Sequence, residues 1–300
     1  MRTSAQLPPP TPPFLGSEAV AAKLVTRYAL SRRFVAIYPD VYLPYGTQLT
    51  ATLQARCAWL WSRRRGVVAG QSAAAVHGAK WVDDHAPAEL LYDCRRPPPN
   101  VRAWSDRVET DEVEQVEGMT VTTPARTALD LACRYPLDRA VAAIDALARA
   151  TDVSPSDVES LIARYPGRRG IRRARTVLTL IDAGAQSPRQ TWLRLLLRRA
   201  GFPPPQTQIP VHDQSGQLVT TADLGWPNIK VAVDCEGGHQ WITRQAFNEA
   251  MQRYERLTQL GWIDIRVTVD DTESAVIARV TEAWTRRKRP LSVVPRNSSL

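Results

Sequence analysis

Long hydrophobic runs are absent from this chain of 300 residues. No run of 18 apolar residues occurs, so we expect no membrane-spanning helix. Residues 1–13 are rich in proline and polar side chains and lack the apolar core of a signal peptide, so we expect a disordered tail there. These absences together predict a cytoplasmic protein.

Several short motifs of enzymes and metal sites are also absent. The sequence contains no G-x-G-x-x-G, no phosphate-binding loop and no H-E-x-x-H, so nucleotide hydrolysis and zinc proteolysis have no support. The four cysteines lie far apart, without C-x-x-C spacing, at Cys57, Cys94, Cys133 and Cys235. This pattern predicts reduced thiols instead of a disulfide framework or a zinc site.

Arginine, by contrast, is abundant. The formal net charge is +9 and the sequence pI is about 9.8, a balance that favours binding to polyanions. Between Arg164 and Arg199 there are ten arginines and a single acid, Asp182. Two interpretations are open: a solvated helix surface, or a face that contacts phosphates through paired hydrogen bonds. On the second interpretation, the predicted nucleic-acid contacts in this run are Arg168, Arg169, Arg172, Arg173, Arg194 and Arg198.

Three acidic residues surround a short apolar segment near the end of the chain. Residues 231–233, Val-Ala-Val, have the length and β-branching of a buried strand. Asp234 and Glu236 follow two positions apart, so their side chains leave the same face, and Asp223 lies eleven positions upstream. Such a cluster is costly unless a cation or proton neutralises it. Carboxylates suit Mg²⁺ or Mn²⁺, ions that assist phosphodiester cleavage.

The elements around these acids have a definite order. Ser187 can cap a helix that begins with Pro188 and ends before Gly201. A second helix is predicted over 244–260 and an alternating strand over 262–269. The predicted order is therefore helix, strands with acids, helix, strand.

This order and these residues resemble the bacterial domain family related to very-short-patch-repair endonucleases. The matching positions are Ser187-Pro188, Asp223, Asp234-Cys235-Glu236-Gly237, His239, and Gly261-Trp262 through Arg266. The resemblance implies a restriction-like PD-(D/E)xK fold. It also implies a metal site of Asp223, Asp234 and Glu236 that holds Mg²⁺ or Mn²⁺, with His239 assisting. The sequence departs from the family pattern at three places: Gln190 replaces a Glu, Asp234 and Glu236 exchange lengths, and Asn248 replaces an Asp.

The N-terminal half has other features. Residues 34–44 are predicted to form two short strands joined by a Pro-Asp turn, a wing-like hairpin flanked by Arg27, Arg32 and Arg33. Further on, the sequence contains Ser72-Ala73-Ala74, His77-Gly78, and Thr123-Pro124-Ala125-Arg126-Thr127 followed by Asp130. Over residues 16–150 these segments resemble the AbiEi-type antitoxins of abortive-infection systems. The resemblance implies an N-terminal winged helix that contacts DNA through the three arginines, and a cognate toxin as partner. The alternative is a small structural domain with an amphipathic hairpin.

We therefore predict a mixed α/β (α+β) protein. A helical N-terminal region with a small β-hairpin precedes a restriction-endonuclease-like mixed sheet flanked by helices. The predicted parts are a tail at 1–13, an AbiEi-like DNA-binding or structural region at 14–150, an arginine-rich helical linker at 151–186, a nuclease-like domain at 187–285 and a basic tail at 286–300. Two functions stay open: a metal-dependent DNA endonuclease of repair or phage defence, or a non-catalytic DNA-binding regulator or antitoxin.

Overall fold

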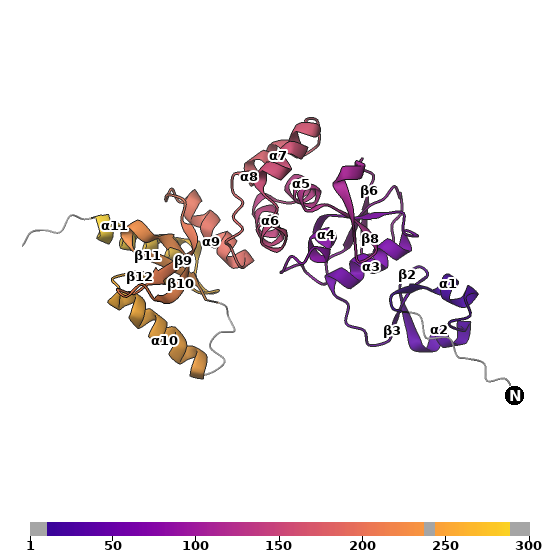
Figure 1. Ribbon diagram of the computed structural model, residues 1–300, viewed down its shortest axis with the longest axis horizontal. Helices are drawn as coiled ribbons and strands as arrows, with labels where there is room; N and C mark the ends of the chain where they lie inside the picture. The colour runs from indigo at the N-terminus through magenta and orange to yellow at the C-terminus, as the bar shows by residue number, and fades with distance from the viewer. Residues whose placement is uncertain (1–10, 237–243, 289–300) are drawn as a thin grey trace, which may run out of the picture. The chain divides into compact units, whose positions relative to one another are not determined.

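A computed structural model describes residues 11–236 and 244–288 of the chain, with the side chains of 244–251 excepted (Figure 1). Within these residues the chain divides into two compact units, with the boundary after Ala183. Most of the two predicted tails and the predicted site residue His239 lie outside the described residues.

The first unit begins with a small three-stranded sheet and two short helices. Its elements are β1 (Phe14–Leu15), α1 (Gly16–Ala21), α2 (Arg27–Arg33), β2 (Phe34–Tyr38) and β3 (Val41–Pro44). The strands are antiparallel in the order β1-β3-β2. Thr26 caps α2 by accepting a hydrogen bond from the Ala29 amide, and Asp40 adopts a left-handed conformation at the turn between β2 and β3. The predicted hairpin over 34–44 is thus present.

A larger mixed sheet follows, in the order β6-β5-β4-β8-β7. Its strands are β4 (Val67–Val68), β5 (Ala88–Leu91), β6 (Val101–Trp104), β7 (Val113–Val116) and β8 (Met119–Thr122). The helices of this part of the unit are α3 (Ala51–Trp61), α4 (Gly70–Val76), α5 (Pro124–Arg134), α6 (Leu137–Thr151), α7 (Pro155–Arg164) and α8 (Ile171–Leu178). Apolar side chains from α3, α4 and the sheet form one core.

The segment 151–186 differs from the expected linker. Its helices α7 and α8 pack against α5, as the group of α5 to α8 in Figure 1 shows. Each buries an apolar stripe: Val158, Leu161 and Ile162 in α7, and Ile171, Ala174 and Val177 in α8. Their arginines lie on the remaining surface of these helices, which is why charge alone suggested a linker.

The arginine of the Thr-Pro-Ala-Arg-Thr motif is fully buried. The Arg126 side chain is 0% exposed. Its guanidinium forms an ion pair with Glu112, lies 3.2 Å from Asp130 Oδ1 and donates to the Arg107 carbonyl at 3.1 Å. Glu112 also accepts hydrogen bonds from the Tyr165 hydroxyl at 2.7 Å and from Arg164. Burial raises the pKa of Glu112, but these hydrogen bonds outweigh it and lower the pKa overall, so the carboxylate stays charged.

This network joins three parts of the first unit. Arg126 lies on α5, Glu112 on the 3₁₀ turn η1 (Thr110–Glu112) before β7, and Tyr165 at the end of α7. The other residues of the predicted AbiEi motifs are also structural: Thr123 caps α5, Ser72 accepts the Glu89 amide, and His77 Nε2 lies 2.7 Å from the Thr122 carbonyl.

The second unit contains a four-stranded sheet in the order β12-β11-β10-β9. Its elements are α9 (Pro188–Arg199), β9 (Gln206–His212), β10 (Leu218–Trp226), β11 (Val231–Cys235), α10 (Arg244–Gln259), β12 (Ile263–Val267) and α11 (Glu273–Lys288). The first three strands are antiparallel and β12 is parallel to β11. Side chains of α9 and α11 form a core with one face of the sheet, while α10 lies on the other side (Figure 1). The mixed sheet flanked by helices confirms the predicted fold class.

Replacement of the buried guanidinium tests this account of the first unit. We expect Arg126→Met to lower the free energy of unfolding by about 3–5 kcal/mol, because the two buried acids Glu112 and Asp130 lose the fully buried positive charge that lies between them. The measurement is chemical denaturation of the full chain, with hydrogen exchange of the α5 amides to locate the effect. The control is Arg56→Met, which removes a half-exposed guanidinium that lies 4.0 Å from Glu117 Oε2 and donates to the Glu117 carbonyl at 2.8 Å, and should cost less than about 1 kcal/mol. Equal losses in the two variants would contradict the network's importance.

Candidate functional site

The structure brings two of the three predicted acids together. Asp223 lies on β10 and Asp234 on the adjacent β11. The Asp223 amide donates to Asp234 Oδ1 at 2.7 Å, and the Cys235 amide donates to Asp223 Oδ2 at 2.9 Å. Burial and the nearby Asp234 raise the pKa of Asp223. The spacing of the sequence therefore placed both acids correctly on neighbouring strands.

Arginines of the same unit already occupy positions beside these carboxylates. Arg253 of α10 donates to Asp234 Oδ2 at 2.6 Å and to the Thr221 carbonyl at 2.9 Å. Arg266 of β12 lies 3.0 Å from Glu236 Oε1, so the third predicted acid is also paired. Asp234 is 4% exposed, and hydrogen bonds between a guanidinium and a buried carboxylate are among the strongest in proteins.

A further acid, Asp264, joins the cluster from β12 and was not predicted. Its side chain is fully buried and lies 3.3 Å from Arg266. Burial, and then the charge of Asp234, raise its pKa to about 7. The signal was present in the sequence: Asp264 and Arg266 alternate with Ile263, Ile265 and Val267, which places an acid and a base on one face of a predicted strand.

Gln190 takes the place at which the endonuclease family has a glutamate. Its Oε1 atom accepts the Gln186 amide at 2.6 Å. A hydrogen bond from its side chain also offsets part of the rise in the Asp223 pKa that burial and Asp234 cause. The amide thus stabilises Asp223 in its charged form, whereas a carboxylate here would add another negative charge to the cluster.

The described residues do not fit a divalent cation. Across residues 11–236 and 244–288, no group of three His, Cys, Asp or Glu side chains is arranged to hold a metal ion. Mg²⁺ needs near-octahedral oxygen ligands at about 2.0–2.1 Å. Here both oxygens of Asp234 accept hydrogen bonds, and Arg253 already supplies a positive charge. The predicted set of Asp223, Asp234 and Glu236 is therefore held by hydrogen bonds and arginines in this arrangement.

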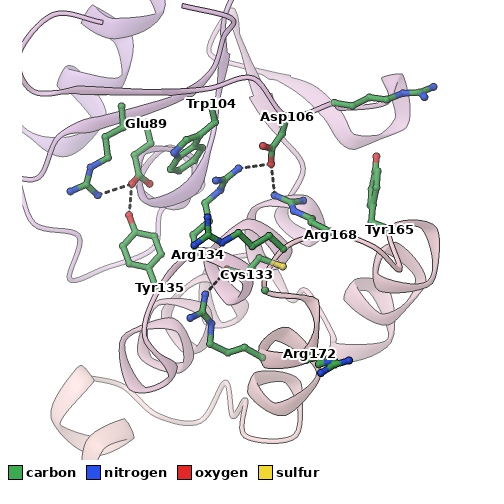
Figure 2. Close-up of a pocket in the computed structure, with 14 residues that line it drawn as sticks. Glu89, Trp104, Asp106, Cys133, Arg134, Tyr135, Tyr165, Arg168 and Arg172 are labelled. Atoms are coloured by element: carbon green, nitrogen blue, oxygen red, sulfur yellow. Dashed lines mark hydrogen bonds and ion pairs between the residues drawn. The ribbon is translucent and has the colours of Figure 1, made fainter. Parts of the chain in front are cut away.

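A second feature is a pocket of about 990 Å³ in the first unit (Figure 2). It lies between β6, α5 and α8 and the loops around them. Seven arginines line it: Arg102, Arg107, Arg134, Arg168, Arg169, Arg172 and Arg173. Trp104, Tyr135 and Tyr165 contribute aromatic rings, and Glu89 and Asp106 are its two acids. The sequence indicated the arginines of 168–173 but not the pocket, because β6 and α5 are far from them in sequence.

Both acids of the pocket are bound by neighbouring groups. Glu89 is 1% exposed, and it accepts the Gln71 amide at 2.7 Å and the Tyr135 hydroxyl. Burial raises the pKa of Glu89. Asp106 binds Arg134 and lies 2.9 Å from Arg168, as the dashed lines in Figure 2 show.

The predicted nucleic-acid contacts lie in several different environments. Arg27, Arg32 and Arg33 are exposed on α2, and Arg169 and Arg172 are exposed at the pocket. Arg168 and Arg173 bind acids or carbonyls of their own unit.

The prediction for Arg194 needs a correction. This side chain is 3% exposed on α9, where it lies among buried leucines, and it offers no surface to a phosphate. Arg198 is half-buried on the same helix. Since α9 belongs to the second unit and Arg168 to the first, the arginine run from 164 to 199 is not a single helix face.

Removal of Arg253 tests whether the acidic cluster is neutralised by an arginine or by a metal ion. In the parent protein we expect Mg²⁺ to leave the melting temperature unchanged. Arg253→Met should lose about 2 kcal/mol of stability, because Asp234 keeps a buried charge without its partner, and Mg²⁺ should restore part of that loss. Arg256→Met, at an exposed position of the same helix, is the matched control. A rise in the melting temperature of the parent with Mg²⁺ would contradict this arrangement.

The pH dependence of stability tests Asp264. Its pKa is raised in the folded state, so its contribution to stability is largest below the unfolded pKa and is lost as pH rises towards about 7. An asparagine at this position cannot ionise. The free energy of unfolding of Asp264→Asn, relative to that of the parent, should therefore rise by about 2 kcal/mol from about pH 5 to about pH 8. Chemical denaturation at both pH values measures this difference. A constant difference between variant and parent would show that Asp264 does not titrate in this range.

None of the helices in the described ranges has the length and apolar character needed to cross a membrane. Comparison with curated proteins finds two uncharacterized proteins of Mycobacterium tuberculosis: MT2308 of strain CDC 1551 / Oshkosh and Rv2248 of strain H37Rv. Each is 31% identical over 159 residues, which are 53% of this chain and 58% of the relative. The chain thus spans little more than half the length of these relatives. No solved structure matches.

A family model matches the part of the chain that contains the pocket. Residues 66–180 match the AbiEi antitoxin C-terminal domain. The matched range begins before β4 and ends after α8, so it includes the Arg126 network and the segment first expected as a linker. The match confirms the predicted AbiEi resemblance over residues 66–150 and extends it to residue 180, whereas residues 16–65, with the hairpin and its three arginines, lie outside the matched range.

Proposed function

We propose that this protein is an antitoxin-type regulator of an abortive-infection system that binds DNA without cutting it. The observation that carries the proposal is the match of residues 66–180 to the AbiEi antitoxin C-terminal domain. An antitoxin of this kind acts with a cognate toxin, so a toxin protein is the proposed partner of the domain.

The N-terminal elements suit a contact with the DNA backbone. Helix α2 has no fully buried residue and follows the short α1, and the hairpin β2–β3 comes directly after it. Its exposed side chains include Arg27, Arg32 and Arg33, and Tyr28 is 72% exposed with Arg32 over its ring. A helix that exposes arginines and an aromatic ring beside a hairpin has the chemistry of a small DNA-binding module.

The second unit supports binding or assembly better than catalysis. Arg253 and Arg266 pair with the acids that would otherwise hold a metal ion, and Gln190 replaces a carboxylate. A nuclease needs the cation to polarise the phosphate and to lower the pKa of a water. On our proposal the unit keeps the order of elements of a nuclease-like fold but serves for binding and does not catalyse cleavage.

A Mg²⁺- or Mn²⁺-dependent endonuclease is the second candidate function. It is favoured by one observation, the close approach of Asp223 and Asp234 on adjacent strands within the predicted helix–strand–helix order. It requires Arg253 to leave Asp234 when DNA and metal bind, and it assigns a role to His239, which lies outside the described residues.

Salt-dependent binding to duplex DNA tests the proposed function. We expect binding by the full chain to weaken with salt, with a slope of log affinity against log salt of about −0.9 per phosphate contacted. Joint replacement of Arg27, Arg32 and Arg33 by Glu should lower the affinity by at least about tenfold and flatten the slope. Fluorescence anisotropy with a labelled duplex measures both quantities.

The control makes the same change of charge elsewhere. Arg149, Arg175 and Arg256 are exposed on three other helices, and their joint replacement by Glu keeps α2 intact. This control should retain most of the affinity. If the two triple variants bind DNA equally, α2 is not the DNA-binding element.

A further inference from the structure

We infer that the arginine-lined pocket of the first unit is a nucleotide-binding site, which takes phosphate groups and a planar base together. The inference goes beyond the proposed role in DNA binding, because it concerns a different surface and a different ligand. It rests on the charges, the helix end, the aromatic rings and the size of the pocket.

Among the described residues, the pocket is lined by seven arginines and two acids, an excess of positive charge. Its two acids are already bound, Glu89 by Tyr135 and the Gln71 amide, and Asp106 by two arginines. Within the described part of the chain, Arg169 and Arg172 form no ion pair or hydrogen bond through their side chains, and Arg102 lies 3.5 Å from Glu89 with 53% of its side chain exposed. Arginines gathered in a concave site attract anions and bind phosphates through paired hydrogen bonds.

Other arginines of the pocket are held in place. Arg173 donates to the Ala132 carbonyl at 3.2 Å and to the Cys133 carbonyl. The guanidinium of Arg134 lies 3.8 Å from the centroid of the Trp104 ring, and its buried Nε atom has no hydrogen-bond acceptor. A fixed guanidinium with an unsatisfied donor loses little entropy when an anion binds.

The N-terminus of α8 opens at the same pocket. Gly170 precedes the helix with φ of 89°, and no side chain caps the first amides. A Cβ atom at Gly170 would lie 2.2 Å from the Cys133 carbonyl oxygen, so the close approach of α8 to α5 requires glycine here. The Ile171 amide already donates to the Arg168 carbonyl at 3.1 Å, and the next amides of the first turn can donate to phosphate oxygens and add to the arginines.

Size and aromatic content favour a nucleotide over a single phosphate. The volume of about 990 Å³ lies at the upper end of the usual range for small-ligand sites, about 300–1,000 Å³. Trp104, Tyr135 and Tyr165 come from three different elements and line the same space (Figure 2). Aromatic and guanidinium planes stack on bases of any sequence. The source of the nucleotide is either a free nucleoside triphosphate or the phosphorylated end of a strand.

Isothermal titration calorimetry with the full chain tests the inference. The probes are ATP, GTP, inorganic triphosphate and an oligonucleotide with or without a 5′-phosphate. We expect a nucleoside triphosphate to bind at one site per chain and more tightly than inorganic triphosphate. Tighter binding of the 5′-phosphorylated oligonucleotide would instead assign the pocket to a strand end, with the same recognition of phosphate and base.

Variants connect the binding to the pocket. Arg169→Glu with Arg172→Glu should lower the affinity by at least about tenfold, because two phosphate contacts become repulsive. Arg175 lies on α8 but does not line the pocket, so the nucleotide affinity of Arg175→Glu should stay within about threefold of the parent's. Trp104→Leu should weaken nucleoside triphosphate but not inorganic triphosphate.

Three results would overturn the inference: no binding of any nucleotide, equal binding of inorganic triphosphate and nucleotides, or unchanged affinity in the Arg169/Arg172 variant. Circular dichroism of each variant verifies that it is folded. The α2 triple variant should keep its nucleotide affinity, so failure of the DNA-binding proposal and failure of this inference give different results.

Discussion

The buried guanidinium of Arg126 is the interaction on which the antitoxin-like domain depends. It is the fully buried positive charge between Glu112 and Asp130, whose other arginine partners, Arg164 and Arg168, are less buried. Asp130 in turn binds Arg168, and Glu112 binds Tyr165, so the network sets the position of α7 and of two residues that line the pocket. The arginine of the Thr-Pro-Ala-Arg-Thr motif therefore supports the pocket from within the domain instead of lining it. Loss of this ion pair should disturb the pocket as well as the stability of the domain.

In the second unit, too, a guanidinium pairs with a buried acid, here within a cluster of three aspartates. Asp223, Asp234 and Asp264 come together on three adjacent strands, an arrangement in which repulsion must be relieved by a cation or a proton. The chain supplies a guanidinium from α10 at Asp234, and the raised pKa of Asp264 allows that group to hold a proton. The acidic cluster of the second unit is thereby stabilised by groups of the chain itself. On the proposed function, this balance of charges is what allows the protein to bind DNA without cutting it.

Local patterns in the sequence predicted the elements better than their partners. Helices over 188–199 and 244–259 and the hairpin over 34–44 followed from caps, apolar spacing and turn residues. The spacing of the acids around an apolar strand also led to the expectation that Asp223 and Asp234 lie on adjacent strands. Arg253 could not be assigned to Asp234 in the same way, because the pairing depends on how α10 crosses the sheet. The pocket likewise depends on the packing of α8 against α5, which the high charge of residues 164–175 concealed.

Incubation of supercoiled plasmid with saturating full-length protein and Mg²⁺ or Mn²⁺ tests the central claim most directly. The account predicts that the plasmid is retarded in a gel while the protein is bound, and that all of it is recovered supercoiled after protease treatment. Metal-dependent nicking that disappears in Asp234→Asn would contradict the account. It would show that Arg253 yields its place to a catalytic cation when DNA binds.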